Sequence, residues 1–219
     1  MRPAALLFDW DNTLVDAWAG IVAALNEVFA QWNLPPWTVQ QGRERIRGSM
    51  RNSFPPLFGP TWPDAVAAFG PAMRRVHLDH VAALAGTEAM LDIAGTWPVG
   101  VVSNKPGGFL RAEVEHLGWQ GRFRAVVGAG DAEADKPHPA PILHALATIG
   151  VEAGPAVWYV GDTALDMQTA HAAGCTAVLL GDAAHDGGIT LMQESGSPPG
   201  LYFADALALA TYLGGLQHG

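Results

Sequence analysis

Five short apolar runs constrain the fold of this chain more than any other feature of its sequence. The runs are continuous rather than alternating, as in strands whose two faces are both covered by helices. Segments of helical periodicity separate the later runs, at residues 108–117, 139–149 and 164–173. Alternating strands and helices predict an α/β fold with a doubly wound parallel sheet. The predicted strands are residues 4–8, 99–102, 125–127, 156–160 and 177–180.

The segment between the first two predicted strands is too long for one connection. It holds 90 residues, 9–98, without a convincing strand, far more than one crossover helix needs. Apolar residues recur at helical spacing over residues 16–32 and 64–84, which predicts two amphipathic helices. We therefore expect a core formed by residues 1–14 and 85–219, with a helical domain, residues 15–84, inserted into it.

The C-terminal part is expected to be less regular. Residues 181–200 are rich in Gly, Ser, Pro and Asp, a composition typical of loops. We expect this loop to precede a last short strand near Tyr202 and a C-terminal helix.

The charge balance disfavours two classes of partner. Lys and Arg number 12 against 21 Asp and Glu, so the formal net charge is −9. This charge repels nucleic-acid phosphates and an anionic membrane surface. No stretch approaches the roughly 18 apolar residues of a membrane span, and carboxylates interrupt the N-terminal apolar run too early for a signal peptide. We expect a cytoplasmic protein that binds neither nucleic acid nor membrane.

Two carboxylates, Asp9 and Asp11, follow the first apolar run directly. Ligands of open parallel sheets bind beyond the carboxyl ends of the strands, so both acids are expected at the ligand-binding edge. Such a pair is unfavourable unless a shared proton or a cation relieves the repulsion. Mg²⁺ favours carboxylate oxygens together with water and substrate phosphate. An acidic turn in which Asp11 caps a helix explains the same residues about as well.

Three later motifs add a hydroxyl, a lysine and two further acids after other strands. Ser103 ends one apolar run, Lys136 precedes a helix, and Asp162 and Asp166 lie one helical turn apart. A hydroxyl beside backbone N–H groups suits a phosphoryl oxygen, and a fixed lysine suits a phosphate or a carboxylate. Each motif alone is also typical of an ordinary helix start. Their joint occurrence at strand ends indicates one site.

The four motifs DWDNT, VSNK, KPHP and GDTALD resemble, in this order, those of the haloacid dehalogenase superfamily of phosphohydrolases. The resemblance covers essentially the whole chain, including the insertion, and is closest to the phosphoglycolate phosphatase-like branch with an α-helical cap. It implies a Mg²⁺-dependent phosphatase that forms an aspartyl-phosphate. The implied partner is a small phosphorylated metabolite, such as phosphoglycolate or a sugar phosphate.

The resemblance also implies roles for individual residues. Asp9 is the expected nucleophile, Asp11 the general acid and then base, and Thr13 positions their loop. Ser103 and Asn104 are expected to bind the transferring phosphoryl group, and Lys136 to offset charge on the nucleophile and the phosphate. Asp11 would bind Mg²⁺ through its backbone carbonyl. Asp166 would act either through a water molecule or by orienting Lys136. The implied metal-site residues are Asp9, Asp11, Asp162 and Asp166.

Two other functions stay open at this point. An acid at position 11 fits ester chemistry because a leaving oxygen needs a proton. A phosphosugar mutase of the same superfamily, however, has the same two acids as Asp9 and Asp11. A phospho-acceptor or binding module without turnover also combines a nucleophilic Asp, acids that bind Mg²⁺, a hydroxyl residue and a lysine.

Substrate recognition is expected in the inserted domain. An arginine-rich segment, residues 43–51, stands out there, and Arg47 is the candidate to pair with a substrate carboxylate or second phosphate. A solvated basic helix face is the alternative. The sequence is compatible with a monomer or a homodimer.

Overall fold

The chain forms two compact units in the computed structural model, which describes residues 2–46, 50–194 and 196–217. One unit joins Met1–Val15 to Ala83–Gly219, and the other is Asp16–Ala82. The boundaries expected from the sequence, after residues 14 and 84, lie within two residues of these divisions.

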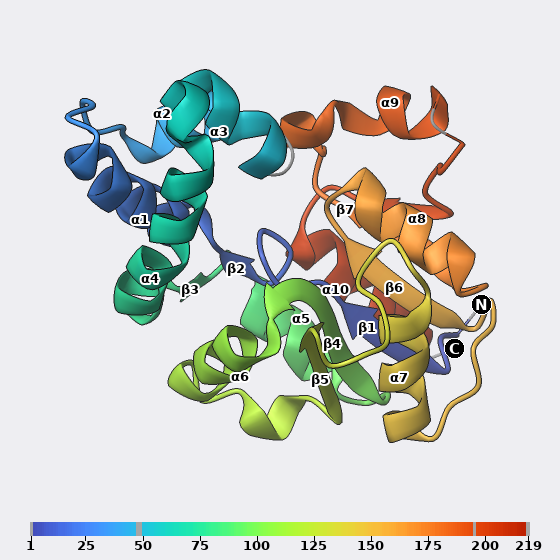
Figure 1. Cartoon of the computed structure of the whole chain (residues 1–219). Helices are drawn as coiled ribbons and strands as arrows, with labels where there is room; N and C mark the ends of the chain where they lie inside the picture. Colours follow the sequence, from blue (N-terminus) through green and yellow to red (C-terminus); the bar gives the residue numbers. More distant parts are fainter. Residues whose placement is uncertain (1, 47–49, 195, 218–219) are drawn as a thin grey trace. The chain divides into compact units, whose positions relative to one another are not determined.

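The first unit is built on a parallel sheet of six strands in the order β5-β4-β1-β6-β7-β8 (Figure 1). The strands are β1 (Ala5–Phe8), β4 (Val99–Pro106), β5 (Ala125–Ala129), β6 (Val157–Gly161), β7 (Thr176–Leu180) and β8 (Leu201–Phe203). All four residues of β1 are buried, and β1 pairs in parallel with β4 and β6. The five predicted strands and the short strand near Tyr202 are confirmed.

Helices cover both faces of this sheet. They are α5 (Thr87–Ala94), α6 (Gly107–His116), α7 (Ala140–Ile149), α8 (Ala164–Ala172), α9 (Gly188–Glu194) and α10 (Ala206–Gln217). Leu7 and Tyr159 face α7 and α8 in one apolar cluster. On the opposite face Trp158 packs against Tyr212 of α10, and α10 packs against α5. The predicted doubly wound α/β fold is therefore confirmed, and the continuous apolar strands follow from this double covering.

The segment 181–200 differs from the expected loop. It contains a 3-10 helix (Ala184–Asp186) and α9, and Met192 of α9 is fully buried in the cluster beneath α7 and α8. Three apolar residues, Ala183, Ile189 and Met192, anchor this segment to the core. The glycine-rich composition did not predict α9, because this helix is stabilised by tertiary packing rather than by local helix propensity.

The inserted unit is helical, as expected. Its helices are α1 (Trp18–Gln31), α2 (Val39–Arg45), α3 (Met50–Phe58) and α4 (Trp62–His80), with a 3-10 helix at Gly59–Thr61. α1 packs against α4, and Phe29 contacts Trp37 and Phe58 in an aromatic core. Two strands that the sequence did not predict, β2 (Val15–Asp16) and β3 (Ala82–Ala83), pair at the boundaries of the unit. α4 consequently ends before residue 84.

In the described ranges no helix, including the 19-residue α4, is both long and apolar enough to cross a membrane.

We predict that the packing around Gly161, the last residue of β6, tolerates no side chain. A methyl group at Gly161 would overlap the side chain of Asp166. Gly161→Ala should lower the free energy of unfolding by about 1–3 kcal/mol, measured by urea denaturation. Gly214→Ala in α10, where an added Cβ meets nothing within 4 Å, is the control and should not destabilise the protein. Equal stability of Gly161→Ala and the parent would contradict this packing.

Candidate active site

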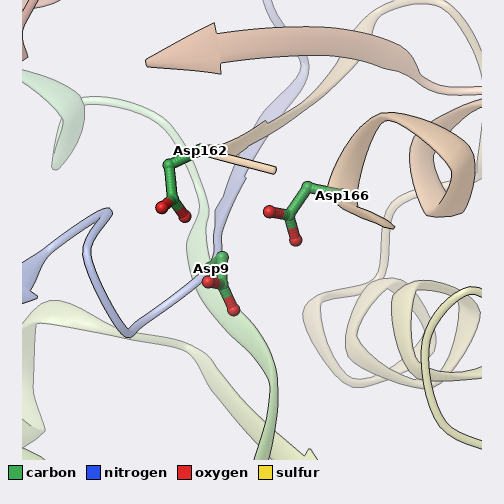
Figure 2. Close-up of side chains that lie close together, drawn as sticks. All are labelled: Asp9, Asp162 and Asp166. Atoms are coloured by element: carbon green, nitrogen blue, oxygen red, sulfur yellow. The ribbon is translucent and has the colours of Figure 1, made fainter. Parts of the chain in front are cut away.

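Three acids converge at the carboxyl edge of the sheet. Asp9 follows β1, Asp162 follows β6, and Asp166 lies in the first turn of α8. Figure 2 shows the three side chains close together. One oxygen from each lies within 4.8 Å of the other two. The residues are only 6%, 4% and 0% exposed, so their charges need partners within the protein.

Lys136 supplies one such partner. Its Nζ donates to Asp9 Oδ1 and Asp166 Oδ1, both at 2.7 Å, and to the Tyr159 hydroxyl at 3.1 Å. These contacts use all three N–H donors of the ammonium group. The side-chain amide of Asn104 binds the Lys136 backbone on both sides, donating to its carbonyl at 3.0 Å and accepting from its N–H at 2.9 Å. The lysine is thus fixed at both ends.

The hydrogen bonds of Asp166 favour a positioning role for this acid. Its Oδ2 accepts from the Thr163 backbone N–H at 3.1 Å and from the Thr163 hydroxyl at 2.6 Å, which forms a capping box at the start of α8. Its Oδ1 accepts from Lys136. With both oxygens engaged, Asp166 is better suited to orient the lysine than to bind a cation directly.

Asp162, unlike Asp166, does not have both carboxylate oxygens engaged by aligned donors among the described residues. Its Oδ1 accepts from the Thr13 hydroxyl at 2.9 Å. Its Oδ2 lies 3.1 Å from His185 Nε2, but among the described residues no donor makes an aligned hydrogen bond to it. A buried carboxylate oxygen in this state is suited to a cation. The all-oxygen donor set of Asp9 and Asp162 fits a hard ion such as Mg²⁺.

Burial shapes the ionisation of this cluster. It raises the pKa of Asp9 to about 7, although Lys136 opposes the rise, while Asp166 and Asp162 add to it. Burial also raises the pKa of Asp162, against the pull of His185. The pKa of Asp166 is lowered, because Lys136 and Thr163 outweigh its burial. Lys136, even with His185 beside Asp162, does not neutralise the three acids, and a divalent cation would add further positive charge.

A second lysine, Lys105, contacts Asp11 through a side chain that is 8% exposed. Lys105 Nζ donates to Asp11 Oδ1 at 2.7 Å and to Glu113 Oε2 at 2.6 Å. The indole N–H of Trp10 donates to the same Glu113 oxygen at 2.6 Å. Burial raises the pKa of Asp11, and Lys105 opposes this rise. The Asp11 side chain thus belongs to a different ion-pair network from that of Asp9, and its backbone-carbonyl contact to a metal stays a prediction.

Two further residues were predicted to belong to the site, Ser103 and Arg47. Ser103 is buried in β4 just beyond a shift in strand register after Val102, and its hydroxyl accepts from the Lys105 backbone N–H at 3.3 Å. Arg47 lies outside the described residues, so its role stays a prediction.

Two neighbouring arginines of the inserted unit already have partners. Arg43 pairs with Asp16 at 2.8 Å. The Arg45 guanidinium lies 5.0 Å from the centre of the Trp37 ring.

Known proteins that are similar to this chain identify its family. The sequence profile of the haloacid dehalogenase-like hydrolases matches residues 6–180. The chain belongs to this family. A curated phosphoglycolate phosphatase of Xanthomonas campestris is 34% identical over 188 residues, which cover 80% of this chain and 82% of that protein.

Two further relatives of this hydrolase are informative. An N-acetylmuramic acid 6-phosphate phosphatase of Pseudomonas aeruginosa is 30% identical over 186 residues, 80% of each chain. The crystal structure of a haloacid dehalogenase-superfamily hydrolase from Ehrlichia chaffeensis has a TM-score of 0.67, with 26% identity and 99% of both chains covered.

Sequence reasoning missed four residues that contact the site of this hydrolase. In the sequence Tyr159 is one more residue of an apolar strand, and Glu113 is one of several polar residues of a predicted helix, so neither gives a signal of its own. His185 lies in the segment that was expected to be a loop. Lys105 is part of the VSNK motif, so its position there was the one available signal.

We predict that the metal-free hydrolase loses stability as Asp9 ionises. The pKa of Asp9 is about 7 in the folded protein against an ordinary 3.8. The folded state therefore holds this proton more tightly than the unfolded chain, and its advantage is lost as pH rises from about 4 to about 7. In EDTA, Asp9→Asn should exceed the parent in unfolding free energy by roughly 2–4 kcal/mol at pH 8, with almost no difference at pH 4.

Urea denaturation at several pH values measures this difference. Glu152→Gln, which neutralises an exposed acid of the same unit, is the control and should follow the parent. A stability difference that does not change with pH would show that Asp9 does not ionise in this range.

Proposed function

We propose that this hydrolase is a Mg²⁺-dependent phosphatase that cleaves a small phosphomonoester through an aspartyl-phosphate on Asp9. The observation that carries the proposal is the position of Asp9 at the end of β1, paired with Lys136 and beside Asp162. The family is one of hydrolases, and the two curated relatives named above, from Xanthomonas campestris and Pseudomonas aeruginosa, are phosphatases of small phosphorylated compounds.

The reaction follows from the chemistry of these side chains. An Asp9 carboxylate oxygen attacks phosphorus, and the bond from phosphorus to the leaving oxygen breaks. Asp11 gives its proton to the leaving oxygen. It then takes a proton from the water that attacks the aspartyl-phosphate, which releases phosphate and restores Asp9.

The other groups neutralise negative charge on Asp9 and the phosphoryl group, or position the residues that do so. Lys136 offsets negative charge on the nucleophile and the phosphoryl group, and the Ser103 hydroxyl donates to a phosphoryl oxygen. Asn104 acts here by fixing the Lys136 backbone. Mg²⁺, when bound by Asp9, Asp162 and the Asp11 carbonyl, supplies further charge neutralisation of the phosphoryl oxygens.

Phosphoglycolate and sugar phosphates are the first substrate candidates. The names of the two curated relatives support these classes. The inserted unit, with Arg47, is the proposed recognition element, since a mobile cap excludes water and contacts the leaving group. Cytoplasmic location and a monomeric or homodimeric state stay predictions.

We expect phosphate release from a panel of phosphoglycolate, hexose 6-phosphates and nucleoside monophosphates, with Mg²⁺ and not with EDTA. Asp9→Asn should lower kcat by on the order of 10³-fold or more, as expected when a nucleophile is lost. Glu152→Gln is the control and should retain the parental rate. A colorimetric phosphate assay measures each rate.

Two results would overturn the proposal. Full activity of Asp9→Asn would exclude the aspartyl-phosphate. Isomerisation of a sugar phosphate with a bisphosphate activator, without phosphate release, would instead identify a mutase.

We further predict that Asp162 and Asp166 have different roles. Asp162→Asn should raise the Mg²⁺ concentration for half-maximal rate by about 10–100-fold, because it weakens the cation site. Asp166→Asn should mainly lower kcat, because Lys136 loses a partner, with much less change in the Mg²⁺ requirement. Initial rates over a Mg²⁺ titration distinguish the two. Equal changes in Mg²⁺ requirement would contradict this division.

A further inference from the structure

A buried chain of polar side chains leads from the hydrophobic core to Asp11 and is not used by the reaction described above. It consists of Trp10, Glu113 and Lys105. We propose that Lys105 and Glu113 are positioning residues that hold the Asp11 carboxyl group where it protonates the leaving oxygen. This inference rests on the proposed phosphatase reaction and extends it to residues outside the nucleophile cluster.

The contacts of Lys105 tie Asp11 to a fixed point. Its Nζ lies 2.7 Å from Asp11 Oδ1 and 2.6 Å from Glu113 Oε2. The Lys105 side chain is 8% exposed and that of Glu113 is 1% exposed, whereas the Asp11 side chain is 30% exposed. Asp11 is therefore the end of the chain that is open to substrate, and the other two side chains anchor it from within.

Glu113 is itself held firmly. It projects from α6, and its Oε2 also accepts the indole N–H of Trp10 at 2.6 Å. Trp10 has no exposed surface and packs edge-on against Trp119 and Phe123, with ring centres 5.7 and 6.3 Å away. The anchor therefore rests on rigid aromatic packing that the core maintains.

The charges in this chain also favour a positioning role. A buried lysine with a single partner would act mainly as an ion-pair partner of Asp11. Glu113 supplies a second carboxylate, so Lys105 is balanced between two acids and serves as a bridge between them. The backbone after Asp11 is held as well, since the Asn12 N–H donates to the Val15 carbonyl at 2.7 Å. A side chain held at both its backbone and its tip is preorganised for proton transfer.

A structural ion pair and a positioning pair predict different kinetics. A misplaced acid slows esters whose leaving group needs a proton and spares those whose leaving group departs as a stable anion. Phenyl phosphate and 4-nitrophenyl phosphate form a matched pair, because they differ by one nitro group and the nitrophenolate is the better leaving group. Their kcat/KM values report the step in which the phenol departs and Asp9 becomes phosphorylated.

The variants are Lys105→Met and Glu113→Gln, each assayed with both esters. Each should lower kcat/KM for phenyl phosphate by about 10–100-fold, part of the usual contribution of a general acid, with little change in KM. The loss for 4-nitrophenyl phosphate should be several-fold smaller. Glu115→Gln, an exposed acid on the same helix, is the control and should leave both values at the parental level.

Folding is controlled by a double variant. Lys105→Met leaves the Glu113 carboxylate buried without its cation and destabilises the protein. Lys105→Met/Glu113→Gln leaves a neutral pair, so it is measured beside the single variants, with thermal midpoints for all of them. If Glu113 acts through Lys105, the double variant should show the same selective loss as a single one rather than the product of two losses.

Equal losses for the two esters, or a loss confined to the thermal midpoint, would overturn the positioning role and leave a structural ion pair. Failure of the underlying function is distinguishable from this. A parent enzyme that releases no phosphate from either ester, or an Asp9→Asn variant that is fully active, would remove the reaction and the positioning role together.

Discussion

The burial of one ammonium group between two carboxylates is the interaction on which the rest of this site depends. Lys136 contacts Asp9 and Asp166 at 2.7 Å in a region closed to solvent. A buried ion pair is favourable only when geometry and further hydrogen bonds offset desolvation. Here Tyr159 and Asn104 supply those bonds. The lysine thereby fixes the loop after β5, the end of β1 and the start of α8 relative to one another.

The proposed nucleophile and the proposed general acid each contact a different lysine. Lys136 serves the nucleophile Asp9, and Lys105 contacts Asp11, the proposed acid. Each lysine is balanced by a second acid that does not contact the other lysine. This separation lets neighbouring carboxylates, two residues apart in the sequence, experience different surroundings, which is how two acids acquire different tasks.

Much of this arrangement was predictable because it depends on local sequence. Continuous apolar runs give buried strands, and the carboxyl ends of parallel strands meet at one edge, so Asp9, Ser103 and Asp162 were expected to approach one another. The hydrogen bonds from Trp10 to Glu113 and from the Tyr159 hydroxyl to the Val102 carbonyl were not predictable, since each is made across more than 50 residues of sequence. α9 was missed because its formation depends on burying Met192 in a core assembled from other segments.

The sequence by itself determined the strands, the order of the motifs and the residue types at the strand ends, because periodicity and turn chemistry act over a few residues. Only the tertiary structure decided which oxygen each donor reaches. It turned Asn104 toward the Lys136 backbone, engaged both oxygens of Asp166, and left Asp162 Oδ2 without an aligned donor among the described residues. It also joined Trp10 to Glu113. These choices depend on burial and packing between distant segments, since desolvation makes each polar group take whichever partner the assembled core brings within reach.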